Sequence, residues 1–325
     1  MIDKRADLEA VALKARKITR QHFGRTISLY APLYISNYCE NQCLYCGFNA
    51  KLAITRKKLS HDEIERECQA LKKTGLQNVL VLTGGSREHS PVSYIKAAAL
   101  IAKKYFQGIA IEVYPLETKE YRELYLAGVD GVALYQETYD QDVYDRLHLF
   151  GEKKNYLFRY QAPERIAEAG IRQISMGVLL GLADWQRDIS ALFAHLEALW
   201  EKYPGVEFSL SFPRLRMITT DNDNYFNISD LELLQIIIAA RLRFPRVGIN
   251  MSTRENAEFR NKILEYGVTK ISAGSSTSVG GYAINGCEPK QFSIHDRRSP
   301  KEIKNWLAAK GYDPVVTDWR SIPNE

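Results

Sequence analysis

The chain has 325 residues, of which 45% are hydrophobic, and this is enough to bury a large core in a single domain. Its net charge of +5 comes from short basic pairs such as Lys103-Lys104 and Lys153-Lys154, which we expect on solvated faces and not in the aromatic-interleaved stripe of a nucleic-acid-binding protein. No apolar run approaches the length of a membrane span or of a secretory signal, so we expect a cytoplasmic protein that binds neither nucleic acid nor membrane.

Residues 2–22 combine charged residues with apolar residues at helical spacing. Leu8, Val11, Ala15 and Ile18 recur every three or four positions, which predicts an amphipathic helix. We expect an N-terminal helical extension over residues 1–26, packed on the rest of the chain or on a partner, and one domain over residues 27–325.

Three cysteines follow the first predicted strand, an apolar run that contains Leu33 and Ile35. Cys39, Cys43 and Cys46 have the spacing C-x3-C-x2-C in a polar, turn-forming loop. Three thiolates on one short loop suit an iron–sulfur cluster or a zinc ion. A cubane cluster held by three cysteines has one iron without a protein ligand, and that iron is free to hold a small chelating molecule.

A structural zinc site is the alternative that the cysteines leave open. Such a site normally takes four protein ligands, whereas Cys68 and Cys287 are isolated and the histidines show no paired spacing. A disulfide framework is less consistent, because three clustered cysteines do not crosslink a chain of this length. The number of ligands therefore favours the cluster. Both the cluster and the free cysteine thiols of the chain require the reducing cytoplasm.

Beyond the cysteine loop, helical segments and short apolar runs alternate. Ser60 and Glu63 form a capping-box pattern, and residues 78–82 form the continuous apolar run of a strand buried on both faces. Further strands are expected at residues 109–114, 132–135, 174–180, 206–212, 247–251 and 268–273, with helices at 62–74, 94–106, 118–127, 163–169, 185–203, 229–244 and 256–266. This is the alternation of an α/β fold, and we expect a (β/α)8 TIM-type barrel.

Polar residues at the carboxyl ends of the predicted strands form the candidate site, because that end carries the chemistry in such barrels. Thr83, Gly84 and Gly85 follow the second strand, where glycines either expose backbone groups to a ligand or form an ordinary turn. Glu137 follows the fourth strand and is placed to accept both hydroxyl protons of a ribose or to cap the next helix. Arg159, on an aromatic-rich helix, needs an anion, either a ligand carboxylate or an acid such as Glu137.

Two further strand ends supply groups that suit a free amino acid. Arg254 follows the seventh strand and Ser272 lies at the end of the eighth. A guanidinium with a neighbouring hydroxyl binds a carboxylate. The alternative for Arg254 is a salt bridge with Glu255 or Glu258 at the start of a helix.

The cysteine spacing, with Tyr45 just before the last cysteine and Phe48 just after it, resembles that of the radical S-adenosylmethionine (SAM) enzymes. Residues 32–37, 136–139 and 213–216 resemble segments of the aromatic amino-acid lyase subgroup, in particular the tyrosine lyases of thiamine thiazole biosynthesis. The resemblance covers nearly the whole chain. It departs at Gly85 and Ser86, where the subgroup usually has an acidic residue.

The resemblance implies roles for the candidate residues. Cys39, Cys43 and Cys46 would hold a [4Fe-4S] cluster whose open iron binds the amino and carboxylate groups of SAM. The other implied cofactor-binding residues are Tyr45, Phe48, Thr83, Gly84, Gly85, Glu137 and Arg159, with the glycine segment at the SAM amino group, Glu137 at the ribose and Arg159 at the SAM carboxylate. Arg214 and Arg216 would line the adenosine side.

For the substrate, the resemblance implies that Arg254 holds the carboxylate with Ser272 beside it, and that Tyr34 lies near the backbone end. The implied fold is a radical SAM barrel with an N-terminal helix. The implied reaction is cleavage of the Cα–Cβ bond of L-tyrosine to 2-iminoacetate (dehydroglycine) and 4-methylphenol (p-cresol), started by a 5′-deoxyadenosyl radical that takes hydrogen from the tyrosine amino group.

The implied partners are a flavodoxin or ferredoxin as electron donor and thiazole synthase as the downstream enzyme. Three alternatives stay open. One is a tryptophan lyase of the same subgroup, and another is a tyrosine lyase of the hydrogenase-maturation type without its second cluster domain. The third, from a different class, is a zinc-stabilised binding module without catalysis.

Overall fold

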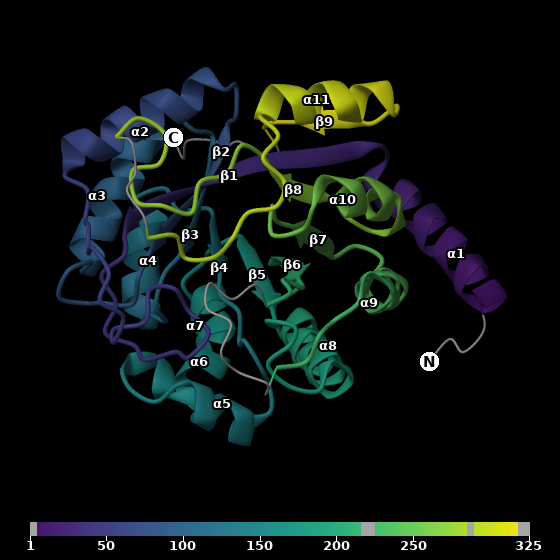
Figure 1. Ribbon diagram of the computed structural model, residues 1–325, viewed down its shortest axis with the longest axis horizontal. Helices are drawn as coiled ribbons and strands as arrows, with labels where there is room; N and C mark the ends of the chain where they lie inside the picture. The colour runs from purple at the N-terminus through teal and green to yellow at the C-terminus, as the bar shows by residue number, and fades with distance from the viewer. Residues whose placement is uncertain (1–4, 216–224, 285–288, 318–325) are drawn as a thin grey trace.

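The computed structural model describes residues 5–215, 225–284 and 289–317, and in them the apolar runs of the sequence pair side by side as parallel strands (Figure 1). The strands are β1 (Thr26–Ser36), β2 (Asn78–Thr83), β3 (Gly108–Glu112), β4 (Gly131–Ala133), β5 (Gln173–Gly177), β6 (Glu207–Ser211), β7 (Gly248–Met251), β8 (Lys270–Ser272) and β9 (Asp313–Val315). Strands β1 to β8 follow one another around the sheet, and β1 pairs with both β8 and β2. The eight strands therefore close into a barrel, which confirms the expected (β/α)8 fold.

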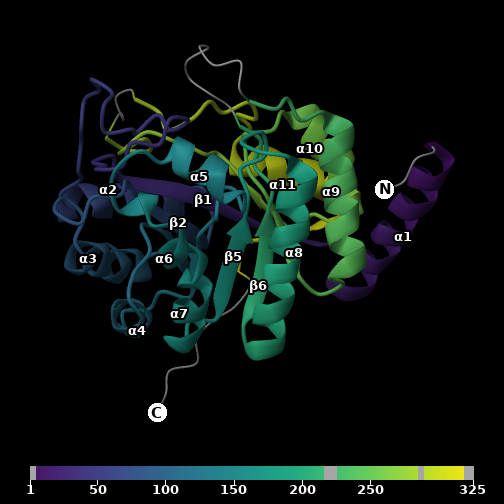
Figure 2. The ribbon, with the colours of Figure 1, turned by 90° about the horizontal axis from the view of Figure 1, so that it is seen from below.

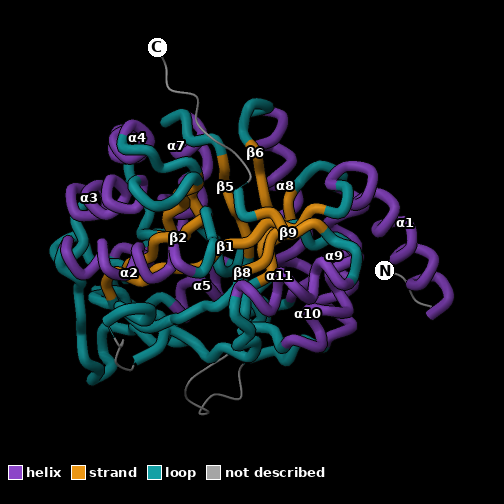
Figure 3. The backbone as a smooth tube through the Cα atoms, turned by 90° about the horizontal axis from the view of Figure 1, so that it is seen from above, coloured by secondary structure: helices purple, strands orange, loops and turns teal. Residues whose placement is uncertain are grey.

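Helices connect the strands and cover the outside of the barrel (Figures 2 and 3). They are α1 (Arg5–Phe23), α2 (His61–Lys73), α3 (Val92–Lys103), α4 (Thr118–Leu126), α5 (Gln141–Leu147), α6 (Tyr156–Tyr160), α7 (Ala162–Glu168), α8 (Trp185–Lys202), α9 (Asp230–Arg243), α10 (Ala257–Ile263) and α11 (Pro300–Ala309), with 3-10 turns η1 (Glu152–Lys154) and η2 (Leu264–Tyr266). Every expected strand and helix is present, with ends that differ by a few residues.

The sequence also encodes elements that we did not predict. Helix α11 begins with a capping box in which Ser299 and Glu302 bond each other's backbone N–H groups, the same device that Ser60 and Glu63 form at α2 as expected. Strand β9 adds to the amino-terminal end of β1. With three residues, β9 is too short for its pattern to stand out in a sequence.

The N-terminal helix lies against the barrel's own outer layer. Ala12 and Ala15 of α1 form a small apolar cluster with Ile238 of α9, and Arg16 forms an ion pair with Glu265 at 3.2 Å. The amphipathic helix expected from the first residues is confirmed, and it packs on this chain beside α9 (Figure 1).

None of the helices in the described ranges is both long enough and apolar enough to cross a lipid bilayer.

The carboxyl ends of the strands point toward one end of the barrel, where the long connecting loops gather, as the β5 and β6 arrows in Figure 2 show. All candidate residues that follow strands are therefore brought to this end.

Candidate active site

The three cysteines of the loop after β1 face a single cavity, which we call the cysteine cavity. Cys39, Cys43 and Cys46 all line it, and none is in a disulfide. Two polar groups reach the sulfurs: the Phe48 backbone N–H donates to Cys46 Sγ at 3.4 Å, and Asn41 Nδ2 donates to Cys39 Sγ at 3.6 Å. The geometry is that of three soft ligands converging on one space.

The electrostatics of this trio call for a metal. Burial, with smaller contributions from the nearby Cys46 and Cys39, raises the pKa of the Cys43 thiol to about 12, although Lys153 lowers it. Three thiolates facing one cavity, one of them buried, repel one another, so they are stable together only beside a strong cation. The donor set therefore fits an iron–sulfur cluster.

A fourth protein ligand of the zinc type is not found in the cysteine cavity. Its described lining contains no further cysteine and no histidine, and Cys68 lies elsewhere, buried in α2. Cys287 lies outside the described residues. The potential metal-ligand group that the described residues do form, Glu40 with Glu88 and His89, contains no cysteine.

The glycine segment after β2 is hydrogen-bonded to the cysteine loop on both sides. The Gly84 N–H donates to Ser36 O at 2.8 Å, and Gly85 O accepts from the Glu40 N–H at 2.9 Å. Thr83, Gly84 and Gly85 all line the cysteine cavity. Space explains both glycines: a Cβ at Gly84 would lie 2.3 Å from Tyr38 O, and one at Gly85 would lie 2.2 Å from Asn41 Nδ2. A side chain at Gly85 therefore requires the Asn41 side chain to move, whereas one at Gly84 meets backbone.

Replacing Gly84 by alanine should displace the cysteine loop, because the added methyl group meets the backbone that leads into Cys39. Overpacking of this kind costs about 1–3 kcal/mol, so we expect at least about fivefold lower activity together with a lower iron content after reconstitution. Gly205→Ala is the matched control, because a Cβ there meets nothing within 4 Å. Full iron content and activity in Gly84→Ala would show that the loop does not depend on this close approach.

A charged triad of Glu137, Lys153 and Arg159 also lines the cysteine cavity. Glu137 Oε1 is 2.6 Å from Lys153 Nζ and 3.4 Å from Arg159 Nη2, and Arg159 Nε donates to Tyr135 O at 2.7 Å. Burial alone would raise the pKa of Glu137, but Lys153 and Arg159 hold it below its ordinary value. All three members line the cavity, so they offer both an anion and cations to a bound molecule.

The triad settles two of the alternatives that the sequence left open. Glu137 does not cap the next helix, because the N-cap of α5 is Asp140. The ion pair between Arg159 and Glu137 does form. Glu137 also has a φ of 74°, the one positive φ among described non-glycine residues. Such strain is held in place by surrounding structure and often marks a functional position.

Sequence reasoning missed Lys153. We expected the Lys153-Lys154 pair on a solvated face, and for Lys153 this is wrong, because η1 turns its ammonium group into the cysteine cavity and onto Glu137. Arg56 was missed in the same way. Its guanidinium donates to the backbone oxygens of Phe48 and Asn49 and so braces the cysteine loop.

Of the two aromatic residues of the cysteine motif, only Phe48 faces the cysteine cavity. Phe48 is buried and lines the cavity, and its ring meets Tyr34 edge to face at 6.0 Å. Tyr45 is not part of the cavity lining; its hydroxyl is 2.7 Å from His148 Nε2. The backbone beside His148 pairs with Cys43 as an isolated antiparallel bridge, so Tyr45 anchors the loop to the segment before η1.

A second cavity, the upper barrel cavity, lies inside the carboxyl-terminal half of the barrel. Its lining combines apolar side chains with a few polar ones, as small-molecule sites do. Its polar lining includes Tyr34, Ser272 and Arg254, so the structure brings together the three residues proposed for the substrate. Arg254 lies 3.4 Å above the Phe292 ring and forms no ion pair with a described residue.

The salt bridge considered for Arg254 does not form. Glu255 instead pairs with Arg214, and Glu258 pairs with Lys262 at 2.6 Å. Ser272 Oγ accepts from the Thr253 N–H at 3.0 Å.

Arg214 is a structural residue in this chain. Its guanidinium also reaches Asp230 at 2.8 Å and Ile228 O at 3.0 Å. It is absent from the lining of the cysteine cavity, while Phe212 and Pro213 line the upper barrel cavity. Arg216 lies outside the described residues.

The two cavities meet at Glu112 and Leu82, which line both of them. Glu112 is the last residue of β3. Burial raises the pKa of its carboxyl group to about 7. Sequence reasoning missed it; the available signal was a single carboxylate at the carboxyl end of an otherwise apolar strand.

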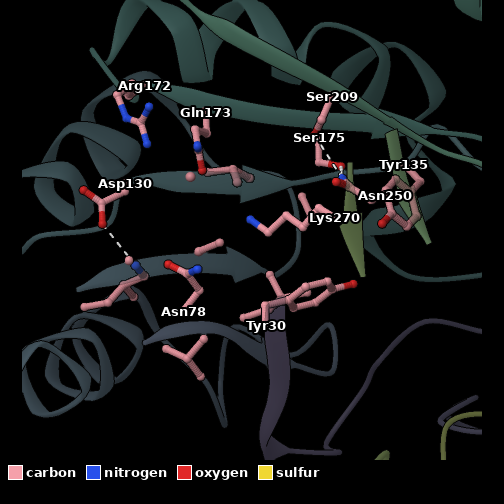
Figure 4. A pocket seen from close by; sticks show the side chains of 18 residues that line it. Tyr30, Asn78, Asp130, Tyr135, Arg172, Gln173, Ser175, Ser209, Asn250 and Lys270 are labelled. Carbon is pink, nitrogen blue, oxygen red and sulfur yellow. Dashed lines mark hydrogen bonds between the residues drawn. The ribbon is translucent and has the colours of Figure 1, made fainter. Parts of the chain in front are cut away.

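A lower barrel cavity, shown in Figure 4, lies between the amino-terminal halves of the strands. It is polar: Asn250 Nδ2 donates to Ser175 Oγ and Ser209 Oγ at 2.9 and 3.0 Å. It shares Tyr30 and Tyr135 with the upper barrel cavity. None of the predicted candidate residues within the described ranges lines it, so it forms the floor of the site.

A buried carboxylate holds the Gly280-Gly281-Tyr282 turn over the barrel. Glu67 of α2 accepts hydrogen bonds from the N–H groups of Tyr282, Ala283 and Ile284 at 2.9, 2.6 and 2.9 Å. The Tyr282 hydroxyl in turn donates to Pro32 O at 2.7 Å. This turn thus ties the segment after β8 to β1, two residues before Tyr34.

Known proteins resemble this chain along nearly all of its length. Residues 33–194 match the family model of the radical SAM superfamily, and residues 211–313 match the Biotin and Thiamin Synthesis associated domain. The 2-iminoacetate synthase of Salmonella typhimurium is 39% identical over 97% of this chain and 84% of its own length. That of Escherichia coli is 40% identical over the same shares. The structure of the FeFe-hydrogenase maturase HydG from Carboxydothermus hydrogenoformans superposes with a TM-score of 0.91 at 33% identity, over 97% of this chain and 74% of that one.

Proposed function

Since the chain belongs to the radical SAM superfamily, among the relatives of 2-iminoacetate synthase, we propose that it cleaves the Cα–Cβ bond of L-tyrosine to 2-iminoacetate and 4-methylphenol. One observation carries the proposal. The cysteine cavity and the upper barrel cavity, which holds Arg254, meet at Glu112 and Leu82. A cofactor in the first and an amino acid in the second would therefore be held next to each other, as a reaction by a short-lived radical requires.

The cysteine cavity offers a complementary group for each part of SAM. Cys39, Cys43 and Cys46 would hold the [4Fe-4S] cluster, which, when bound with SAM, supplies the one-electron cleavage that gives methionine and the 5′-deoxyadenosyl radical. The segment of Thr83, Gly84 and Gly85, which lines this cavity, is assigned to the amino group. Phe48 supplies an apolar wall.

The charged triad completes the cofactor site. Glu137 is placed for the ribose hydroxyls, and Lys153 already neutralises its charge. Arg159 is placed for the SAM carboxylate. Its Nε and Nη2 are engaged by Tyr135 O and Glu137, while Nη1 makes no hydrogen bond with a described residue. One nitrogen of the guanidinium therefore remains for a ligand.

The upper barrel cavity orients the substrate. Arg254 supplies a guanidinium for the carboxylate, with Ser272 and Tyr34 in the same lining. Leu82, Leu233 and Met251 supply apolar contacts for a ring. The enclosed barrel keeps water away from reactive species.

The test is product analysis with the anaerobically reconstituted enzyme. L-Tyrosine, SAM and a reductant should yield 4-methylphenol, 2-iminoacetate and 5′-deoxyadenosine. Indole derivatives from L-tryptophan, without 4-methylphenol from L-tyrosine, would replace the proposal by a tryptophan lyase. Carbon monoxide and cyanide from L-tyrosine would identify a lyase of the hydrogenase-maturation type.

We further propose that a small electron-transfer protein, a flavodoxin or ferredoxin, reduces the cluster in the cytoplasm, and that thiazole synthase consumes 2-iminoacetate. The surface beside the cysteine loop suits the electron donor. Leu44, Leu149 and Phe150 are exposed there by 41%, 45% and 60%. Their segments are joined by backbone hydrogen bonds, Gln42 N–H to Phe150 O at 3.0 Å and Leu44 N–H to Leu147 O at 3.1 Å. This apolar surface therefore lies directly over the loop that carries Cys43.

Phe150→Glu should slow turnover with a protein donor, because a charge replaces an apolar contact, while turnover with dithionite stays unchanged. The loss should be about 10-fold or more, as for a central interface residue. Leu126→Glu is the control, since Leu126 is 70% exposed at the far end of α4. An equal loss with both reductants would place the effect in the active site and not at a docking surface.

A further inference from the structure

Glu112 lies inside the barrel, partly exposed to two cavities, and its carboxylate has no partner in the described part of the chain. It forms no hydrogen bond and no ion pair with any described residue. Holding a carboxylate away from bulk water is costly unless something compensates its charge. Two acids that are buried are satisfied: Glu67 accepts three backbone N–H groups, and Glu137 pairs with Lys153. Glu112 is therefore kept for a group that arrives with a ligand.

The position of Glu112 identifies that group. An amino acid held by Arg254 has its carboxylate in the upper barrel cavity, since Arg254 does not line the cysteine cavity. Its amino group must face the cysteine cavity if hydrogen is to be taken from it there. Among the described residues that line both cavities, Glu112 and Leu82, only Glu112 bears a charge.

We propose that Glu112 binds the α-ammonium group of the substrate and removes one proton from it, so that the substrate meets the radical as a neutral amine. An N–H bond of the ammonium group breaks and an O–H bond forms on the Glu112 carboxylate, with no change in electron count. The inference rests on the proposed function and assigns a catalytic residue to it.

The chemistry explains why such a base is needed. Removing a hydrogen atom from an ammonium group leaves a positively charged nitrogen radical, whereas removing it from a neutral amine leaves a neutral one. In a water-excluded cavity the uncharged product is the less costly of the two. The proton must leave first, and a carboxylate in contact with the ammonium group is the shortest route.

The surroundings tune Glu112 for this step. Burial and, to a smaller extent, the nearby Glu137 raise the pKa of its carboxyl group, and Arg254, Lys153 and Arg159 lower it, so that the pKa is about 7. The tyrosines that feel its charge are Tyr30, Tyr34 and Tyr135. Burial keeps the pKa of each above the ordinary value of 10, so none of them competes as a base near neutral pH.

The first test is the pH profile of 4-methylphenol formation. For wild type, kcat/KM should rise about tenfold per pH unit below the pKa of Glu112, which is about 7, and level off above it, because the free enzyme must be ionised to accept the proton. Glu112→Gln should lower kcat by about 10²–10⁴-fold and abolish the rise of kcat/KM with pH. Glu112→Asp should keep this rise at reduced activity. The iron content of each variant, measured after reconstitution, must equal that of wild type.

The second test measures binding without turnover. Calorimetry on the reconstituted enzyme compares tyramine, which keeps the amino group, with 3-(4-hydroxyphenyl)propanoate, which lacks it. Glu112→Gln should weaken the binding of tyramine by about tenfold or more and leave the binding of the propanoate unchanged, because only tyramine carries an ammonium group. Equal weakening of both, or full activity in Glu112→Gln, would overturn the role of Glu112. Wild type that releases no 4-methylphenol from tyrosine would instead overturn the proposed function.

Discussion

Alanine at Cys39, Cys43 or Cys46 should abolish tyrosine cleavage and remove the visible absorbance of the iron–sulfur cluster after anaerobic reconstitution. All three thiols line the cysteine cavity, and its described lining offers no other cysteine or histidine to replace a lost ligand. Without the cluster no radical forms, so we expect activity to fall by about 10⁴-fold or more, the scale of losing an essential catalytic group. The measurements are the visible spectrum, the iron and sulfide content, and 5′-deoxyadenosine formation.

Cys68→Ala is the matched control for this series. Cys68 is fully buried in α2 and does not line the cysteine cavity. The substitution removes one thiol from the core, so it should cost some stability while iron content and activity per folded chain stay at the wild-type level. A cluster that survives in Cys39→Ala, Cys43→Ala or Cys46→Ala would contradict the assignment of all three as ligands.

Arg254→Gln should lower kcat/KM for tyrosine by about 100-fold or more, mainly through a higher KM. Truncating one partner of a buried charge pair costs about 2–5 kcal/mol, and here the partner would be the substrate carboxylate. Arg254→Lys should recover part of the loss, because it keeps the charge without the fork of two donors. The measurement is steady-state 4-methylphenol formation, together with calorimetric binding of tyrosine and tyramine.

The analogue separates a carboxylate anchor from a merely structural arginine. Tyramine has no carboxylate, so its affinity should change far less than that of tyrosine in Arg254→Gln. Arg243→Gln serves as the control: Arg243 is half exposed and paired with Glu197, and such surface pairs contribute about 0–1 kcal/mol. If Arg254→Gln weakens the binding of tyrosine and of tyramine equally, Arg254 does not hold the carboxylate.

Several candidate residues were predictable because the chain places them directly after strands. Cys39, Thr83, Glu137 and Arg254 each follow a strand whose apolar run is plain in the sequence. In a parallel barrel the carboxyl ends of all strands lie at one end, so these residues had to approach one another. The closed eight-stranded order of the sheet confirms the topology on which that inference relied.

Other features of the site could not be predicted in this way. Lys153 resembles any surface lysine in the sequence, and only the 3-10 turn η1 directs it onto Glu137. Arg214 resembles a ligand-binding arginine, yet the fold brings Glu255 and Asp230 to it.

By itself the sequence determined the barrel, the cysteine triad and the order of polar residues along one rim, because hydrophobic period and ligand spacing are local properties of a chain. Only the tertiary structure decided which charges are paired and which are kept for a ligand. Glu137 and Glu112 are both acids near strand ends, but one meets two cations and the other meets open cavity. The physical reason is that the state of a buried charge depends on every element packed around it, and those elements come from distant parts of the chain.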